Sequence, residues 1–379
     1  MNKFKTALRL FAAIAAAIGL VTAVQASQVP KTLALADFNG NGDDEAVAVV
    51  DNMGNGLGVV VDTGTLGLAG ASFLFTGPGA VIDAAVLKGQ AAAGRDGVAF
   101  LLQQDRPVLE AYDPQTGKIF RRVRLPAGHE GVSLDTRGNL ACVLTTQTAQ
   151  NNRPRLFTID VTTKAVLSKP ALSKNLTGLN AVFGTVFFSD TCHVLLSRNS
   201  DGKGSVQPWN VSTGMKSDLA ANSAPIPKGQ DPIDHAAAAT FAPSVATLAL
   251  RQADARGRII SNDRSDGTTN WAYALPAGQE PVRMIFYSLF PAPFDLLAVL
   301  ANRNSDNTPV VTILDAETGA LVNTIEYNAG NVGNDVSFHE PTSADPGSSD
   351  PELAVTTNMG VVEIRDSVTG NLIGSLGGG

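Results

Sequence analysis

The segment VVTILDAETGAL (residues 310–321) contains the pattern that decides the fold. A run of β-branched and apolar residues is followed by Asp, then Thr-Gly, then a second short apolar run. This order is typical of a β-hairpin, because Asp and Gly favour tight turns and β-branched residues favour strands. Related segments are VVVDTGTL (59–66), LEAYDPQTGKI (109–119), LFTIDVTTKAV (156–166), VQPWNVSTGMK (206–216), IISNDRSDGTTNW (259–271) and VVEIRDSVTGNL (361–372).

The spacing of this hairpin indicates a repeat protein. Its glycine, or Lys164 where glycine is missing, lies at Gly64, Gly117, Lys164, Gly214, Gly267, Gly319 and Gly370, about 50 residues apart. Another pair of strand-like runs precedes each hairpin, so each unit is predicted to contain four strands.

Four-stranded units of this length predict an all-β, seven-bladed β-propeller with antiparallel blades. Each small sheet has two apolar faces and becomes stable by packing against neighbours in a closed ring. A β-solenoid has shorter repeats, and two separate β domains are the remaining alternative. The blades are predicted at residues 32–78, 79–127, 128–172, 173–224, 225–277, 278–330 and 331–379, within one domain spanning 27–379.

The N-terminus has the features of a secretory signal peptide. Lys3, Lys5 and Arg9 precede an uncharged stretch of about 15 residues, which is short of the roughly 20 that a spanning helix needs. Small residues at 23–26 predict cleavage after Ala26, so residues 1–26 are assigned as signal peptide. The mature protein is therefore expected to be secreted or periplasmic.

Composition narrows the class of partner. The net charge is −7, and we find no cluster of Lys and Arg in the sequence, which argues against nucleic acid or anionic lipid as a partner. We expect a soluble monomer that binds protein or glycan and has no membrane span.

One segment has the pattern of a calcium loop. In DFNGNGDDE (37–45), oxygen-bearing side chains alternate at Asp37, Asn39 and Asn41, and Glu45 can close the loop around Ca²⁺ with help near Asp43. The other interpretation is an ordinary polar turn. A metal here is expected to be structural, because a loop between the first two strands lies away from the face where propellers usually hold ligands.

This loop resembles the FG-GAP or VCBS repeats of integrin-α-like propellers of secreted bacterial type, whose calcium loops read D-x-[DN]-x-[DN]-G-x-x-D. The match is Asp37, Asn39, Asn41, Gly42 and Glu45, with Glu in place of the usual Asp. Only the first unit has the full loop, and the FG and GAP signatures are not clear. The resemblance therefore implies a propeller more than a shared activity.

Three loops align around a glycine and an acid: LPAGHEGV (125–132), PKGQDPI (227–233) and LPAGQEPV (275–282). The alignment predicts equivalent positions near the central opening for Glu130, Asp231 and Glu280, where they form a ligand-binding rim or cap their own turns in solvent. His129 and His235 lie beside the first two acids.

Signs of catalysis are weak. The four histidines have no metal-ligand spacing, and there is no GxSxG, HExxH or P-loop motif. A histidine and acid pair at the axis would support general acid–base catalysis. Trp209 and Trp271 lie in predicted strands, where packing is the default and sugar stacking the alternative.

Cys142 and Cys192 lie in the second strands of neighbouring units. They face each other only if their local registers differ by one residue; otherwise they cannot bond without distortion. Aligning Ala141-Cys142-Val143-Leu144 with Cys192-His193-Val194-Leu195 gives the facing arrangement, which predicts one disulfide.

Three functions are therefore considered. The first is a secreted non-catalytic propeller for protein or glycan recognition with one structural Ca²⁺. The second is an extracellular hydrolase or lyase that acts on a polymer at the axis. The third is an envelope-assembly scaffold.

Overall fold

The computed structural model describes residues 30–376 except 37, 39–44, 53–54, 63–66, 69–72, 75–78, 92–93, 149–151, 187–188, 217–223, 238–243, 264–266, 289–294, 329, 340–350 and 359–360. The predicted signal peptide at residues 1–26 lies outside the described residues.

The described strands fall into seven sets that follow one another along the chain. The first set is β1 (Pro30–Ala36), β2 (Glu45–Asn52), β3 (Asn55–Asp62), β4 (Gly67–Leu68) and β5 (Phe73–Leu74); the second is β6 (Ala80–Leu87), β7 (Gly97–Gln103), β8 (Pro107–Asp113) and β9 (Lys118–Arg124); the third is β10 (His129–Arg137), β11 (Leu140–Gln147), β12 (Arg153–Asp160) and β13 (Ala165–Ser168); the fourth is β14 (Leu176–Val186), β15 (Ser189–Arg198), β16 (Gly204–Asn210) and β17 (Ala224–Pro225). The last three are β18 (Gln230–Ala237), β19 (Ser244–Arg251), β20 (Arg256–Asp263) and β21 (Thr269–Ala274); β22 (Gln279–Ser288), β23 (Asp295–Arg303), β24 (Pro309–Asp315) and β25 (Leu321–Glu326); and β26 (Gly333–His339), β27 (Glu352–Thr357), β28 (Val362–Asp366) and β29 (Leu372–Leu376).

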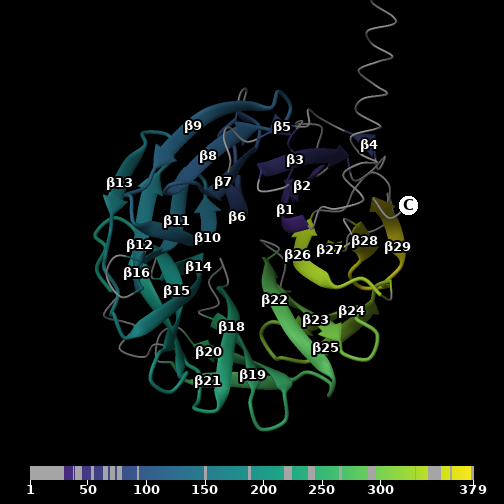
Figure 1. The fold of residues 1–379 in the computed structure, drawn as a ribbon. Coiled ribbons are helices and arrows are strands. Elements are labelled where there is room, and N and C mark those ends of the chain that lie inside the picture. Colours follow the sequence, from purple (N-terminus) through teal and green to yellow (C-terminus); the bar gives the residue numbers. More distant parts are fainter. Residues whose placement is uncertain are drawn as a thin grey trace, which may run out of the picture.

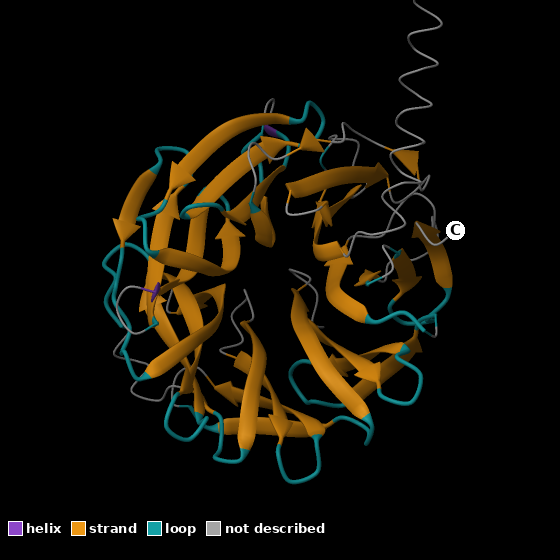
Figure 2. Cartoon of the chain, viewed as in Figure 1, coloured by secondary structure: helices purple, strands orange, loops and turns teal. Residues whose placement is uncertain are grey.

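These strands form an all-β propeller. Six sheets have four antiparallel strands that pair in chain order. The first strand of each sheet lies closest to the centre, and the sheets radiate outward around it (Figures 1 and 2). Strand β1 lies between β6 and β26, so the first sheet contacts the sheets on both sides of it. The predicted propeller with four-stranded antiparallel blades is confirmed for these six sheets.

The first sheet differs from the predicted four strands. It has five, because two short strands, β4 and β5, both pair with β3. Strand β4 pairs with the end of β3 at Val61 and Asp62, and β5 pairs with its start at Leu57 and Gly58. The sequence GLAGAS at 67–72 contains two glycines and is poor in strand-forming side chains, so it favours two short pairings over one continuous outer strand.

The hairpin turn that revealed the repeat is fastened by its own aspartate. The Asp315 carboxylate accepts the backbone N–H groups of Glu317 and Thr318 at 3.1 and 2.7 Å. Gly319 then turns the chain with φ at +72° and donates its N–H to the Asp315 carbonyl. A positive φ favours glycine, which explains why this position repeats. Lys164 adopts the same region at φ of 62°.

Apolar side chains fill the space between neighbouring sheets. For example, Leu248 and Ile259 of one sheet pack with Leu297 and Leu314 of the next, and all four are fully buried. Since each sheet packs on both faces, its middle strands are largely apolar. No helix among the described residues is both long and apolar enough to cross a membrane.

A disulfide between Cys142 on β11 and Cys192 on β15 joins two neighbouring sheets. Leu144 pairs with Ser133 and Leu195 pairs with Asn180, which occupy equivalent places on their first strands. Cys142 thus precedes Leu144 by two positions, whereas Cys192 precedes Leu195 by three. This is the register difference of one that the sequence alignment predicted, and the Cα atoms are 6.1 Å apart.

Candidate functional site

A β-bulge interrupts the first strand of every sheet near its start, and it sets the position of a ring of polar residues. In the six four-stranded sheets, the residue that resumes the pairing after the bulge is polar. We call these residues the axial belt: Asp83, Ser133, Asn180, Asp234, Arg283 and Asp335. A bulge re-aims side chains locally, so its repetition places the belt at one level around the axis.

Belt residues connect one sheet to the next. The Asp83 carboxylate accepts the backbone N–H of Leu134 on the following sheet at 2.8 Å. The Ser133 hydroxyl does the same for Ala181 at 2.9 Å. In both cases the donor is the residue directly after the next belt member. Each link therefore fixes the position of one blade along the propeller axis relative to its neighbour.

The links continue around the ring through an amide and a carboxylate. Asn180 donates from Nδ2 to Oδ1 of Asp234. Asp234 in turn accepts the Met284 N–H through Oδ2 at 2.9 Å. Both Asp234 oxygens are thus in use, and its side chain is almost fully buried.

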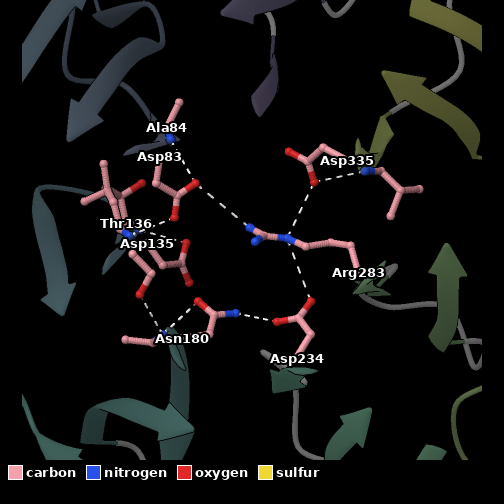
Figure 3. A network of polar contacts seen from close by, with 12 residues as sticks. Asp83, Ala84, Asp135, Thr136, Asn180, Asp234, Arg283 and Asp335 are labelled. Atoms are coloured by element: carbon pink, nitrogen blue, oxygen red, sulfur yellow. Dashed lines mark hydrogen bonds and ion pairs between the residues drawn. The ribbon is translucent and has the colours of Figure 1, made fainter. Parts of the chain in front are cut away.

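Arg283 lies among three belt carboxylates (Figure 3). Its Nε is 3.5 Å from Asp335 Oδ1 and 3.8 Å from Asp234 Oδ2, and its Nη2 is 3.9 Å from Asp83 Oδ1. These separations are ion-pair distances longer than an ordinary hydrogen bond. The Arg283 side chain keeps 38% of its surface exposed. Burial lowers the pKa of Arg283, but the surrounding carboxylates outweigh burial and raise it.

Asp135 adds a fourth carboxylate two residues beyond the belt on β10. It accepts the Phe183 N–H at 2.7 Å and the Thr136 N–H at 2.8 Å. Burial raises the pKa of Asp83 and of Asp135 to about 6, although hydrogen bonds from backbone N–H groups oppose this shift. The described part of the axis therefore brings four carboxylates around one guanidinium.

A cavity of about 460 Å³ lies on the axis beside the belt. Every first strand contributes to its lining: β1, β6, β10, β14, β18, β22 and β26. Asp135, Asn180, Arg283 and Asp335 supply polar groups, while the apolar lining includes Val182, Met284, Ile285 and Phe286. Lys88 and Gly138, in the turns that join first to second strands, also line it. The cavity therefore faces that side of the propeller.

The predicted rim acids lie at the opposite ends of the first strands. Glu130, Asp231 and Glu280 are the second residues of β10, β18 and β22, as the alignment predicted, and none of them lines the axial cavity. Glu130 and Glu280 are exposed, whereas Asp231 accepts a hydrogen bond from Gln252 at 2.8 Å. Their part in ligand binding stays a prediction.

The two histidines of the predicted rim are both buried, and His235, four residues beyond Asp231 on β18, also lines the axial cavity. His129 Nδ1 lies 2.9 Å from the Thr145 hydroxyl, and its ring contacts Phe157 edge-on. His235 Nε2 lies 3.0 Å from the His193 carbonyl oxygen, and burial lowers the pKa of His235 to about 4. His129 is buried while adjacent Glu130 is exposed, so the two do not share one environment.

Both tryptophans pack between blades. Trp271 donates from Nε1 to the Ala316 carbonyl at 3.0 Å. Trp209 packs against the cluster that contains Cys142 and Cys192. These positions match the packing role that is the default expectation for strand tryptophans.

The predicted calcium loop lies outside the described residues. Asp37, Asn39, Asn41 and Asp43 are not described, and only the backbone of Glu45 is, paired with Ala36 at the start of β2. Among the described side chains, no group of three or more His, Cys, Asp or Glu could hold a metal ion.

The axial belt was not predicted from the sequence, although a signal is present. The three aligned loops end at residues 132, 233 and 282, and the next residues are Ser133, Asp234 and Arg283. A repeated Gly or Pro two residues before a polar position marks the bulge, and extending the alignment by one residue reaches the belt.

Solved structures share this architecture. The BBS1N structures in complex with ARL6DN, from crystals soaked with mercury or lead, superpose with TM-scores of 0.60 and 0.61 at 12% identity, covering 92% of this chain and 95% of that chain. An ACO/RPE65 chimera gives 0.52 at 10% identity, covering 78% of this chain and 71% of that one. BamB from Moraxella catarrhalis gives 0.45 at 13% identity, with 87% of each chain covered.

No family model matches the chain, and no curated protein matches it in sequence. At these identities the likeness to BBS1N and to the chimera shows the fold alone. The chain is a β-propeller protein.

Proposed function

We propose that this chain is a secreted, non-catalytic β-propeller that recognises a protein at its axial cavity. The observation that carries the proposal is the cavity itself. It is a concave site in which apolar side chains and convergent polar and charged groups share the lining about equally, and concave sites with convergent polar groups are where ligands usually bind. Arg283 has 38% of its side-chain surface exposed, so part of this side chain is accessible to a ligand.

The apolar lining favours a protein segment over a glycan. Val182, Met284, Ile285 and Phe286 can enclose an apolar side chain, and Arg283 can fix the orientation of a nearby carbonyl group. Both tryptophans, which are the best sugar-stacking groups of the chain, are instead used between blades. The BBS1N propeller, which shares the fold, was crystallised in complex with ARL6DN.

Site-specific photo-crosslinking tests this proposal. Benzoylphenylalanine replaces Ser337, which lines the cavity, in the full chain expressed in its own host. We expect a discrete protein adduct by gel shift, identified by mass spectrometry. Ser337→Trp should fill part of the cavity and abolish capture of the same partner in a binding assay with purified proteins.

Glu280 provides the matched control because it lies at the opposite end of a first strand and is exposed. Crosslinking at Glu280 should not give the adduct, and Glu280→Trp should retain binding. Adducts at Glu280 alone would move the site to the other end of the first strands, where the predicted rim residues His129, Glu130, Asp231 and Glu280 lie. Glycan-array binding that Ser337→Trp abolishes, with no protein adduct, would replace protein by glycan as the ligand.

Export is part of the proposal. Its support is the charged start, the uncharged stretch and the small residues before position 26, together with a disulfide that suits an oxidising compartment. The N-terminal peptide of the mature protein should begin at Ser27 by mass spectrometry. A mature chain that retains residues 1–26 would contradict cleavage.

We also propose one structural Ca²⁺ in the loop of residues 37–45. The support is the alternation of oxygen ligands in the sequence and the pairing of Ala36 with Glu45, which makes the segment a β1–β2 connection. A chelator should lower the melting temperature of the wild-type protein, and Asp37→Ala should remove this sensitivity. An unchanged melting temperature on chelation would exclude a structural metal.

The five-stranded first sheet is proposed as the seventh blade. Its strand β1 contacts β6 on one side and β26 on the other, and Ala34 of β1 lines the axial cavity. The resemblance to FG-GAP or VCBS repeats rests on the calcium loop alone. An experimental structure with seven sheets around the axis would establish the count, and a ring closed by six would refute it.

A further inference from the structure

A second, basic cavity lies on the outer part of the sheet formed by β18–β21. Its volume is about 280 Å³, and Arg251, Arg256 and Arg258 line it together with Ala272 and Ala274. No cluster of Lys and Arg was expected from the sequence. That expectation is wrong for this sheet, because the short turn between β19 and β20 brings three arginines of one eight-residue segment together.

The sheet register explains this grouping. Arg251 on β19 is directly opposite Arg256 on β20, and Arg258 follows two residues later. Residues two apart on a strand share one face, so Arg256 and Arg258 project to the same side. The strand partners of Arg258 are Ala249 and Ala274, whose small side chains leave space beside the guanidinium.

The three guanidinium groups differ in what they already bind. Arg251 pairs with Asp254, through Nε at 2.7 Å. Arg256 donates from Nε and Nη2 to the Leu275 carbonyl at 3.0 and 2.9 Å. Within the described part of the chain, the Arg258 side chain has no hydrogen bond or ion pair. One arginine is thus held by an acid, one is positioned by backbone, and the third has no partner among the described residues.

We propose that this cavity, the basic cleft, binds a phosphate group. Three arginines line the cleft, no acid is among its lining residues, and of the three only Arg251 has an ion pair with a described residue, Asp254. The cleft is therefore locally basic within a chain of net charge −7. Guanidinium groups present paired N–H donors that match the oxygens of phosphate, and charge-assisted bonds of this kind are strong. The phosphate comes either from a free anion or from a lipid headgroup.

Titration of the purified full chain with inorganic phosphate tests the site, with binding followed by phosphorus NMR line broadening. Arg258→Gln should weaken phosphate binding by about tenfold or more, because it removes the available donor group. Circular dichroism and the melting temperature check that the variant is folded. Raising the concentration of NaCl should weaken binding as well.

The matched control is Arg198→Gln. Arg198 occupies the equivalent turn of the preceding sheet and pairs with Asp201 as Arg251 does with Asp254, so its loss should leave phosphate binding unchanged. Equal loss in both variants, or no phosphate binding by the wild type, would overturn the proposal.

Vesicles distinguish the two sources of phosphate. Vesicles of phosphatidylcholine are compared with vesicles that also contain phosphatidic acid. Arg258-dependent sedimentation with phosphatidic acid would identify a lipid headgroup as the ligand. Phosphate binding without vesicle sedimentation would identify the free anion.

Discussion

The Nε atom of Arg283 on β22 lies 3.5 Å from Oδ1 of Asp335 on β26, so a guanidinium bridges two neighbouring blades at the axis. The same side chain approaches Asp234 and Asp83 at 3.8 and 3.9 Å. One cation therefore offsets carboxylates from three other sheets. These three carboxylates are buried, so we expect the stability of the propeller to depend on this charge.

Replacing Arg283 by Gln should destabilise the fold. Removing one partner leaves carboxylates without compensation, and the guanidinium is partly solvated, so we expect a loss of about 1–3 kcal/mol. Urea unfolding measures the change. Arg198→Gln, which breaks an exposed pair with Asp201, should leave the unfolding midpoint nearly unchanged. Equal midpoints for Arg283→Gln and wild type would show that the belt does not need its cation.

Asp83 and Asp135 should each reduce the stability of the fold as the pH rises from about 4 to about 7. Burial raises the pKa of Asp83 and Asp135 to about 6, whereas an unfolded aspartate titrates near 3.9. In this window both folded aspartates hold protons that the unfolded chain has lost, so their contribution to the free energy of unfolding decreases with pH.

His129 and His235 act in the opposite direction. Burial lowers the pKa of both, to about 4 for His235, so their contribution increases as the pH rises toward about 6.5. A hydrogen bond from Arg198 lowers the pKa of Asp201, so Asp201 changes its protonation state below this pH range.

Asp135→Asn isolates one of the two aspartates. Its amide oxygen can still accept one N–H, but it does not titrate. The slope of unfolding free energy against pH should therefore change in the positive direction by up to about 1.4 kcal/mol per pH unit. Urea unfolding at closely spaced pH values provides both slopes. Identical slopes would mean that Asp135 titrates normally in the folded protein.

Reducing the Cys142–Cys192 disulfide should cost about 4 kcal/mol, since the two residues are 50 positions apart. Urea unfolding with and without reductant measures the loss. The unfolding midpoint of the double variant Cys142→Ala and Cys192→Ala should not change when reductant is added. Thiol titration of unfolded, unreduced protein should find no free thiols, and two thiols would contradict the bond.

Alanine substitutions at two glycines can distinguish the cost of a positive φ from the cost of a steric clash. A Cβ on Gly319 would lie 2.5 Å from Trp271 Cδ2, whereas one on Gly278 would meet nothing within 4 Å among the described residues. Both have similar positive φ values, 72° and 77°. Gly278→Ala should cost about 1–2 kcal/mol from φ alone, and Gly319→Ala clearly more. Equal losses in thermal unfolding would show that Trp271 moves aside easily.

The repeat allowed the propeller to be predicted from the sequence. The axial belt was not predicted. Asp and Gly recur in the hairpin turn because local hydrogen bonds and a positive φ require them, so Asp315 and Gly319 reveal the period directly. The one-residue offset between Cys142 and Cys192 was also readable, because apolar runs fix strand register.

The axial belt escaped prediction because its members share a position and not a residue type. Ser133, Asn180 and Arg283 are all polar but differ in size and charge, so they do not stand out as a repeat. The bulges nevertheless place them at one level around the axis. The exposed acids Glu130 and Glu280 stand out as repeated residues, but they lie at the far ends of the strands from the cavity. The chemistry of the first blade, with the loop at 37–45, stays a prediction.

The bond between β11 and β15 also determines what happens after the chain is cut. Cys142 and Cys192 enclose one whole repeat of the chain. A protease that cuts within that enclosed stretch leaves both fragments covalently attached. The nicked protein would therefore run as one species until it is reduced, and this stretch of the ring tolerates a backbone break without losing a piece.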